Sequence, residues 1–125
     1  MSLHNETNSV PIRVPCLWEY GISYDTPNRI LEDHGISDKQ VVIFIHKDFN
    51  RLESILAKLT GAPRVLKRPL DRLNSGLWDL IDGNRTLSEI IQIMEDCYKE
   101  EIIPARQRCS ESISKLIELN LVELK

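Results

Sequence analysis

The sequence predicts an α+β domain of winged-helix-like architecture, in which N-terminal β-strands precede a three-helix bundle and one extra helix is inserted between strands. Residues 14–47 are rich in aromatic and β-branched side chains and are interrupted by turn residues, which is typical of strands. Residues 71–119 carry three apolar stripes at helical spacing. A tight turn at Asp82-Gly83 joins the first two helices. Strands followed by short helices in this order favour a winged-helix-like domain.

The length and the composition fit one small folded domain. The chain has 125 residues, of which 42% are hydrophobic and 28% are charged, so it can bury one small core. Its formal net charge of −3 lacks the basic excess of proteins that are held mainly by nucleic-acid phosphates. The sequence shows no apolar run of membrane-spanning length and no signal-peptide pattern. We therefore expect a soluble, cytoplasmic protein with no membrane partner.

The N-terminal part divides into an arm and a strand-rich segment. Residues 1–13 are polar and have no periodic apolar signal, so they predict a flexible arm, and residues 14–125 then form a single domain. Within residues 14–47, Gly21 marks the first turn. The run QVVIFIHK, residues 40–47, is strongly apolar but too short for a core helix, so it predicts a central strand.

The period of the apolar residues then changes to that of a helix. Residues 48–60 predict an inserted helix, with Asp48 as its N-cap and Gly61 before Pro63 at its end. Its apolar face consists of Leu52, Ile55, Leu56 and Leu59.

Residues 64–70, RVLKRPL, predict a short strand. Pro69 cannot donate a hydrogen bond to a neighbouring strand, so this strand should lie at the edge of its sheet or end there. Because side chains alternate along a strand, its two faces differ. One face carries Val65 and Lys67, and the other carries Leu66 and Arg68.

Three helices follow, and each has recognisable ends. Asp71 is a suitable N-cap for the first helix and Gly83 a suitable stop. Thr86 and Glu89 fit a capping box at the start of the second helix. Pro104 suits the start of the third helix, Asn120 suits a left-handed closing position, and residues 121–125 predict a terminal strand or an extended tail. The apolar stripes are Leu73, Leu77, Leu80 and Ile81, then Leu87, Ile90, Ile91, Met94 and Tyr98, then Ala105, Cys109, Ile113, Leu116 and Ile117.

The sequence offers little for catalysis or for metal binding. Cys16, Cys97 and Cys109 match no zinc motif, and we expect reduced, buried thiols, although the sequence leaves a Cys97–Cys109 pair open. Asp79 lies near Asp82, for which a capping role is sufficient explanation. Ser75 has no histidine base near it in the sequence, and no phosphate-binding glycine loop is present. We expect a protein that is not an enzyme and that holds no cofactor.

The stretch LDRLNSGLWDLIDGNRTLSEIIQIM, residues 70–94, resembles the core signature of the PqqD-like family, whose members are peptide chaperones also called recognition elements for ribosomally made, modified peptides. In that signature a strand ends in leucine, a small residue and an apolar helix follow, and an Asp-Gly turn leads to a capped helix. The resemblance covers residues 63–125, and relative to the shortest members residues 48–60 look like an insertion. The matching positions are Leu70, Gly76, Trp78, Asp82-Gly83, Arg85-Thr86 and Glu89-Ile90.

The resemblance implies a peptide-binding function without catalysis. Members of the family bind the leader of a precursor peptide and present it to a modifying enzyme, often a radical SAM protein. The leader adds as a strand to a sheet edge and packs against a helix, which here would be residues 64–70 and residues 104–119. An exposed edge strand can also pair with itself, so a homodimer stays open. The predicted peptide-binding residues are Val65, Leu66, Lys67 and Arg68 on the strand, with Arg106, Cys109 and Ile113 on the helix.

The charges around the predicted edge strand suggest a preference for an acidic peptide. Residues 64–72 contain Arg64, Lys67, Arg68 and Arg72 against Asp71 alone. A basic edge in an acidic protein would favour an acidic leader through encounter rate and register. The alternative is that these charges, together with Pro69, prevent edge-to-edge aggregation.

Two further functions stay open on the same architecture. A winged-helix DNA-binding regulator would use the third helix, but the second helix is acidic and would repel the DNA backbone, so a nucleic-acid partner is not favoured. A protein–protein adaptor would bind a folded surface in place of a leader, because a fold does not determine function. The third helix offers Arg106, Gln107, Arg108, Ser110 and Lys115 as candidate DNA contacts.

Overall fold

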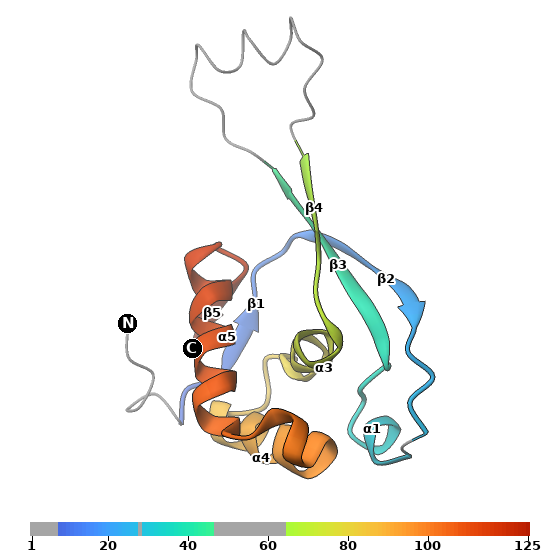
Figure 1. Cartoon of the computed structure of the whole chain (residues 1–125). Helices are drawn as coiled ribbons and strands as arrows, with labels where there is room; N and C mark the ends of the chain where they lie inside the picture. Colours follow the sequence, from blue (N-terminus) through green and yellow to red (C-terminus); the bar gives the residue numbers. More distant parts are fainter. Residues whose placement is uncertain (1–7, 28, 47–64) are drawn as a thin grey trace, which may run out of the picture.

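The computed structural model describes residues 8–27, 29–46 and 65–125, which form a mixed α+β structure with antiparallel strands and four α-helices (Figure 1). The predicted inserted helix, residues 48–60, and the predicted charge at Arg64 lie outside the described residues. Among the residues that are described, no helix has the length and apolar content needed to cross a membrane. The elements in chain order are β1 (Pro11–Arg13), β2 (Leu17–Ser23), α1 (Arg29–Asp33), β3 (Lys39–His46), β4 (Val65–Pro69), α3 (Arg72–Leu80), α4 (Leu87–Tyr98), the 3-10 helix η1 (Lys99–Ile102), α5 (Ala105–Glu118) and β5 (Val122–Leu124).

The larger sheet has three antiparallel strands in the order β2-β3-β4. This order confirms the predicted central strand, which is β3, and the predicted edge strand, which is β4. Val41 and Ile43 of β3 are fully buried, because their face of the sheet packs on α3. The side chains on one face alternate with those on the other, as β geometry requires.

The smaller sheet pairs the two ends of the described chain, β1 with β5. This pairing corrects the prediction of a flexible arm over residues 1–13, because Pro11–Arg13 form a strand and Pro11 is fully buried. The backbones of Val10 and Lys125 extend the pairing with two hydrogen bonds. A strand of three residues has no periodic signal of its own and is stabilised here by a partner at the far end of the sequence. The predicted terminal strand at residues 121–125 is confirmed as β5.

One helix was not expected from the sequence. Residues 14–47 were predicted to be strand-rich throughout, whereas α1 forms a single short turn of helix between β2 and β3. Leu31 from α1 and Ile36 after it are buried, and the Ile36 amide donates to the Leu31 carbonyl at 2.9 Å. A helix of five residues is too short to show an apolar period, and burial of Leu31 is what holds it.

The predicted caps of the three longer helices are confirmed, except that α3 ends at Leu80, before the predicted stop at Gly83. Asp71 caps α3 by accepting from the Asn74 amide at 2.8 Å. Thr86 and Glu89 form both bonds of the capping box at the start of α4, each at 3.1 Å. Gly83 has a φ of 82° in the turn between α3 and α4. Asn120 has a φ of 60° after α5, where the amides of Asn120 and Leu121 donate back to the last turn of the helix.

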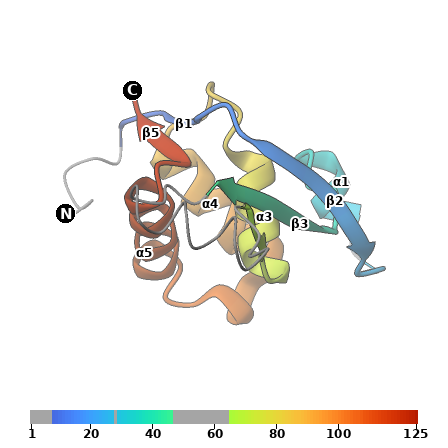
Figure 2. The ribbon, with the colours of Figure 1, turned by 90° about the horizontal axis from the view of Figure 1, so that it is seen from above.

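The core lies where α3 meets the sheet, α4 and η1. Trp78 is fully buried, and its ring meets that of Trp18 edge to face at 5.9 Å between centroids. The Arg13 guanidinium lies over both rings, and its Nε donates to the Ile81 carbonyl at 2.8 Å. Helix α4 packs against both α3 and α5. Seen from above, α5 lies on one side of α3 and β2 on the other, and β3 crosses over α3 (Figure 2).

Candidate functional site

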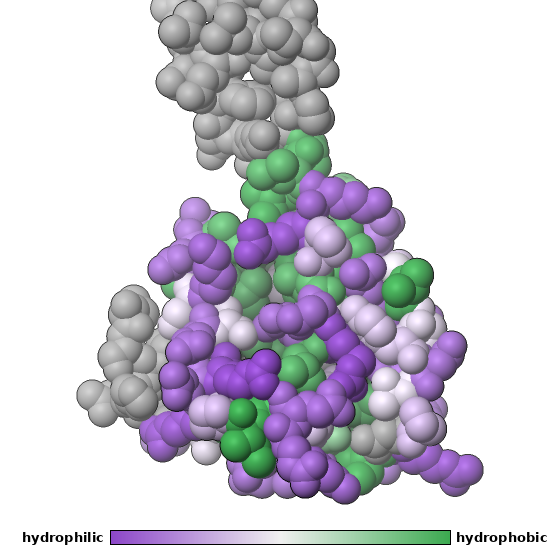
Figure 3. Space-filling view, in the orientation of Figure 1, coloured by the Kyte–Doolittle hydropathy of each residue, from purple (hydrophilic) through white to green (hydrophobic). Residues whose placement is uncertain are grey.

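A groove of about 340 Å³ opens between β4 and α5. Its sides come from the end of β4, the start of α3 and the exposed edge of α5, and its floor comes from buried residues of α3, α4 and α5. In the orientation of Figure 1, apolar surface is visible in the recess between α5 and the strands, with hydrophilic residues around it (Figure 3). The lining residues are Arg68, Leu70, Asp71, Leu73, Asn74, Leu77, Met94, Ile102, Arg108, Cys109, Glu111, Ser112, Lys115, Leu116 and Leu119.

Among the described residues, the strand at this groove has one edge that pairs with no other strand. β4 is the last strand in the order β2-β3-β4, and its five residues are all exposed. In an antiparallel pair, the residues of one strand alternate between exchanging hydrogen bonds with the partner and pointing their N–H and C=O groups away from it. In β4, the N–H and C=O groups of every second residue therefore point to the free edge.

The register identifies which residues those are. Leu70 donates its amide to the Val41 carbonyl at 2.8 Å. Arg68 and Leu66, two and four residues earlier, lie opposite Ile43 and Ile45, so their amide and carbonyl groups point to β3 in the same way. The amide and carbonyl groups of Val65 and Lys67, together with the Pro69 carbonyl, then point to the free edge. Pro69 has no N–H, and at this position β4 loses no bond to β3 because of it.

The opposite edge of the sheet, β2, is less regular. Its pairing with β3 shifts between Tyr20 and Ser23, which is a bulge or a similar irregularity. Irregularities of this kind at sheet edges interrupt the row of free main-chain groups and limit pairing with another chain. Tyr20 on this strand also donates its hydroxyl to Asp79 of α3 at 2.7 Å. Of the two edges of this sheet, β4 is the one that combines a regular free edge with an adjoining groove.

A buried hydroxyl fixes the point where β4 passes into α3. Ser75 Oγ accepts from the Val41 amide at 2.9 Å and donates to the Leu70 carbonyl at 3.3 Å. It thereby replaces the direct hydrogen bond that the Val41 amide would otherwise give to Leu70 in the ladder. Ser75 is only 1% exposed, so these bonds are shielded from water. The end of β4 is held at a set distance from α3.

The floor of the groove is apolar and contains a thiol. Cys109 on α5 lies beside Met94 and Leu116 among the lining residues, and each of the three is buried. Burial raises the pKa of the Cys109 thiol to about 11, although Arg108 opposes the shift. Cys109 is therefore protonated at neutral pH and contributes apolar surface. All three cysteines are free thiols, and Cys16, which was predicted to be buried, is half-exposed.

The rim of the groove carries charges of both signs. Arg108 donates to the Glu101 carbonyl, and Lys115 lies 3.6 Å from Glu118. The two lining carboxylates also have partners, since Asp71 caps α3 and Glu111 accepts from Gln107 at 3.2 Å. Arg68 completes the set of charged lining residues, with three cations against two anions.

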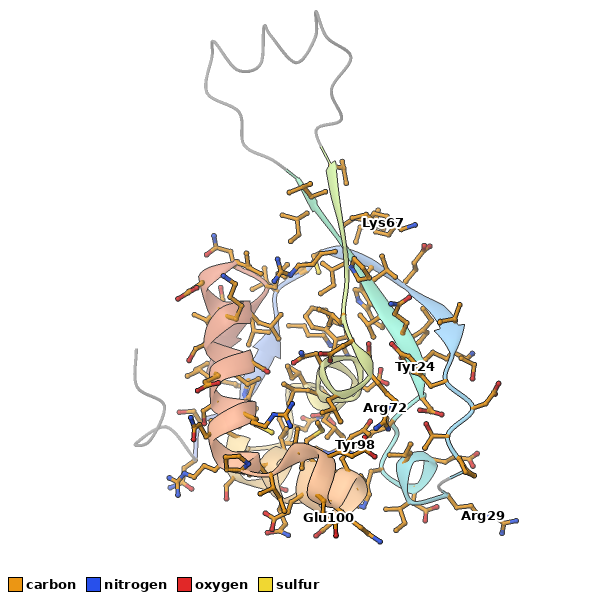
Figure 4. All side chains as sticks on the ribbon, viewed as in Figure 1. Tyr24, Arg29, Lys67, Arg72, Tyr98 and Glu100 are labelled. Atoms are coloured by element: carbon orange, nitrogen blue, oxygen red, sulfur yellow. The ribbon has the colours of Figure 1, made fainter. Side chains whose placement is uncertain are left out.

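The structure distributes the seven predicted site residues over four locations. Arg68 and Cys109 line the groove from opposite sides. Val65, Leu66 and Lys67 lie on the exposed edge strand, and Figure 4 shows Lys67 pointing away from α5. Ile113 is fully buried in the core, and Arg106 is exposed but is not among the lining residues.

The sequence reasoning did not assign several lining residues to a peptide site. On α5, residues 108, 112, 115 and 119 recur at helical spacing beside the buried stripe at 109, 113 and 116. The helical spacing of these four residues beside the buried stripe is the sequence signal that identifies them as one side of a groove. From the sequence, Arg108 and Lys115 are assigned only to DNA contacts. Leu73 and Asn74 enter the groove because α3 starts directly after β4.

The groups considered for catalysis have structural hydrogen-bond partners. Asp79 accepts from the Tyr20 hydroxyl and from both the amide and the hydroxyl of Ser37, so it ties α3 to β2 and to the turn before β3. Asp82 accepts from the amides of Asn84 and Arg85 in the turn, which helps to lower the pKa of its carboxyl. Within residues 8–27, 29–46 and 65–125, no group of three His, Cys, Asp or Glu side chains is arranged to hold a metal ion.

Comparison of the chain with protein-family models, with curated proteins and with solved structures finds no match.

Proposed function

We propose that the chain is a non-catalytic, winged-helix-like protein that binds an extended peptide as an additional strand on β4. The observation that carries this proposal is the free edge of β4 beside a groove walled by α5. Main-chain groups of an edge strand supply affinity for any extended segment, and pockets beside the edge select alternate side chains. The β4–α5 groove combines free main-chain groups on the edge strand with a pocket beside that edge.

The dimensions of the groove suit a few side chains of a peptide. Its volume of about 340 Å³ is at the lower end of the range for small-ligand sites, which is roughly 300 to 1,000 Å³. The floor around Cys109, Met94 and Leu116 can bury apolar groups, while Ser112 and Asn74 offer polar atoms at the sides. A short extended peptide needs this combination of apolar pockets and adjacent main-chain partners.

The resemblance of residues 70–94 to the PqqD-like signature suggests what the peptide is. We propose that it is the leader of a ribosomally made precursor, and that the chain presents it to a modifying enzyme of the radical SAM type. The signature positions support this reading through their structural roles, since Gly76 lies against Tyr98 and Gly83 adopts a positive φ. The same two features would also serve an adaptor that binds a protein surface.

A DNA-binding function receives less support from the same geometry. Arg108 and Lys115, two of the candidate DNA contacts, line the groove and are engaged with Glu101 and Glu118. Helix α4 exposes Glu89, Glu95 and Asp96, whose charges oppose an approach of the DNA backbone. Absence of a band shift with genomic DNA at low salt would agree with this, because even non-specific binding is visible under those conditions.

The test of the proposed function is a titration that follows the backbone amides. Synthetic peptides that tile the N-terminal halves of short open reading frames found beside the gene would be added to ¹⁵N-labelled full-length protein. We expect one peptide to shift the amides of Val65 and Lys67, together with groove residues of α5 such as Ser112. The control is the same peptide with proline at every second position, which cannot form a regular strand. Shifts confined to β1, β5 or α1 would reject the groove as the binding site.

A further inference from the structure

Two neighbouring cations on β4 face opposite sides of the sheet. Arg68 stands opposite the fully buried Ile43 and lines the groove, whereas Lys67 stands opposite Phe44 on the outer face. Figure 4 shows Lys67 directed away from α5. The two side chains are adjacent in sequence and exposed, and each carries one positive charge. A charged group of a peptide bound in the groove can therefore reach Arg68 but not Lys67.

Arg68 differs from the other cations that line the groove. Arg108 is bonded to the Glu101 carbonyl, and Lys115 has Glu118 within 3.6 Å. The guanidinium of Arg68 forms no hydrogen bond or ion pair with any residue in the described ranges 8–27, 29–46 and 65–125. A guanidinium is suited to bind a carboxylate through two parallel hydrogen bonds.

The register of an added strand determines which of its side chains meets Arg68. In an antiparallel addition, a peptide residue opposite Arg68 would be in a non-hydrogen-bonded pair with it, because the amide and carbonyl of Arg68 point to β3. Side chains are closest in such pairs and stand on the same face of the sheet. Peptide residues two positions to either side would then lie opposite Leu66 and Leu70, on the same inward face.

We propose that the groove selects peptides with an acidic side chain between two apolar ones, in the pattern apolar, any, acidic, any, apolar. Arg68 binds the central carboxylate, and the apolar residues contact Leu66 at one end and Leu70 with the groove floor at the other. The pattern reads the same in both chain directions. This inference rests on the proposed function and deepens it, because it names the kind of peptide that the site takes.

The test compares three blocked seven-residue peptides on the full-length protein by fluorescence anisotropy. Each has leucine at the second and sixth positions and threonine elsewhere, and the fourth position is glutamate, glutamine or lysine. A guanidinium binds a carboxylate more strongly than it binds a neutral amide, so we expect glutamate to bind about tenfold more tightly than glutamine, and lysine to bind more weakly still. The difference between glutamate and glutamine should shrink as salt is raised.

Two protein variants provide a matched control. Arg68→Glu and Lys67→Glu change the net charge by the same amount on adjacent residues, so long-range electrostatic effects are nearly equal in both. We expect Arg68→Glu to abolish the preference for glutamate and to favour the lysine peptide. Lys67→Glu should keep the order of the three peptides.

The outcomes separate this inference from the proposed function. Equal affinity of the unmodified protein for the glutamate and glutamine peptides, with amide shifts at Val65 and Lys67 for both, would overturn the charge selection and leave the strand addition standing. Equal loss of the preference in both variants would show that net charge and not Arg68 is responsible. If none of the peptides binds, both the strand addition and the charge selection fail. Because the peptide series uses the unmodified protein, it decides the question even if the Arg68→Glu variant does not fold.

Discussion

The hydroxyl of Tyr98 occupies the space that a side chain at residue 76 would need. A Cβ added to Gly76 would lie 2.2 Å from Tyr98 Oη and 3.0 Å from Tyr98 Cζ. Tyr98 is buried, and the guanidinium of Arg72 lies over its ring at 5.2 Å from the centroid. Arg72 also pairs with Glu101, so this contact joins α3 to the end of α4 and to η1. The absence of a side chain at Gly76 is what allows α3 and the Tyr98 ring to meet.

We expect Gly76→Ala to destabilise the protein. The new methyl group would force the Tyr98 ring or α3 to move, and overpacking of a core costs about 1 to 3 kcal/mol. This loss outweighs the gain of roughly 1 kcal/mol in helix propensity. Chemical denaturation followed by circular dichroism would measure the free energy of unfolding.

The control for this substitution is Gly21→Ala in β2. A Cβ at Gly21 would meet the end of the flexible Gln40 side chain at 3.2 Å, and Gln40 can move aside, so we expect a small effect. Combining Gly76→Ala with Tyr98→Phe should recover part of the loss, because the nearest atom is then removed. A Gly76→Ala variant as stable as the original protein would contradict the close packing of α3 on Tyr98.

Those parts of the fold that depend on local chemistry could be predicted from the sequence. The capping role of Asp71, the Thr86–Glu89 box and the left-handed Asn120 each depend on a few neighbouring residues, and all three are confirmed. The strand Pro11–Arg13 could not be predicted in this way, because its pairing with β5 joins residues from the two ends of the chain. The core contact of Trp18 with Trp78 also joins residues that lie far apart in the sequence.

The candidate site was predictable only in outline. The edge position of β4 followed from Pro69, and the alternation of Lys67 and Arg68 followed from strand geometry. Which residues of α5 face β4 depends on how α5 is rotated about its axis, and that rotation is set by packing against α4. For this reason Ile113 was predicted as a binding residue but lies in the core, while Ser112 beside it lines the groove.

A second prediction concerns the hydroxyl that joins β3 to β4. Ser75→Ala would leave the Val41 amide without its acceptor in a buried position, at a cost of about 1 to 3 kcal/mol in the free energy of unfolding. Hydrogen exchange at the Val41 amide should accelerate by more than exchange at α5. Ser88→Ala at the exposed start of α4 is the matched control and should change the stability by less than about 1 kcal/mol. Unchanged protection of the Val41 amide in Ser75→Ala would argue against the bridging role.

A third prediction concerns alkaline pH. Burial raises the pKa of Cys109 from 9.0 to about 11 in the folded protein, so the unfolded chain loses this proton first. The thiol therefore contributes stability that is fully present below pH 9 and that is lost as the pH rises to about 11, in total roughly 2 to 3 kcal/mol. We expect Cys109→Ala to be less stable at pH 8, because it leaves a cavity, but to lose less stability between pH 9 and pH 11. Parallel pH curves for the two proteins would exclude Cys109 as the titrating group.

The fourth prediction tests the free edge of β4 directly. The Lys67 amide points away from β3, so Lys67→Pro should remove a donor to an added strand while keeping every bond of the β3–β4 ladder. We expect this variant to fold with a loss of about 1 kcal/mol or less and to bind the glutamate peptide at least tenfold more weakly. Lys67→Ala, which removes the same charge but keeps the amide, should bind within about twofold of the original protein.

Proline at the neighbouring residue 66 should affect folding and not only binding. The Leu66 amide is directed at Ile45 of β3, so Leu66→Pro removes a ladder bond, leaves the Ile45 carbonyl without its donor and should destabilise the sheet by about 1 to 3 kcal/mol. The pair of variants therefore separates the two edges of one strand: proline at residue 67 affects binding, and proline at residue 66 affects folding. If Lys67→Pro unfolded the protein as Leu66→Pro does, the register of β4 would be inverted relative to the one described. If Lys67→Pro bound the peptide as well as Lys67→Ala does, the peptide would be held by side chains alone and would not form a strand on this edge.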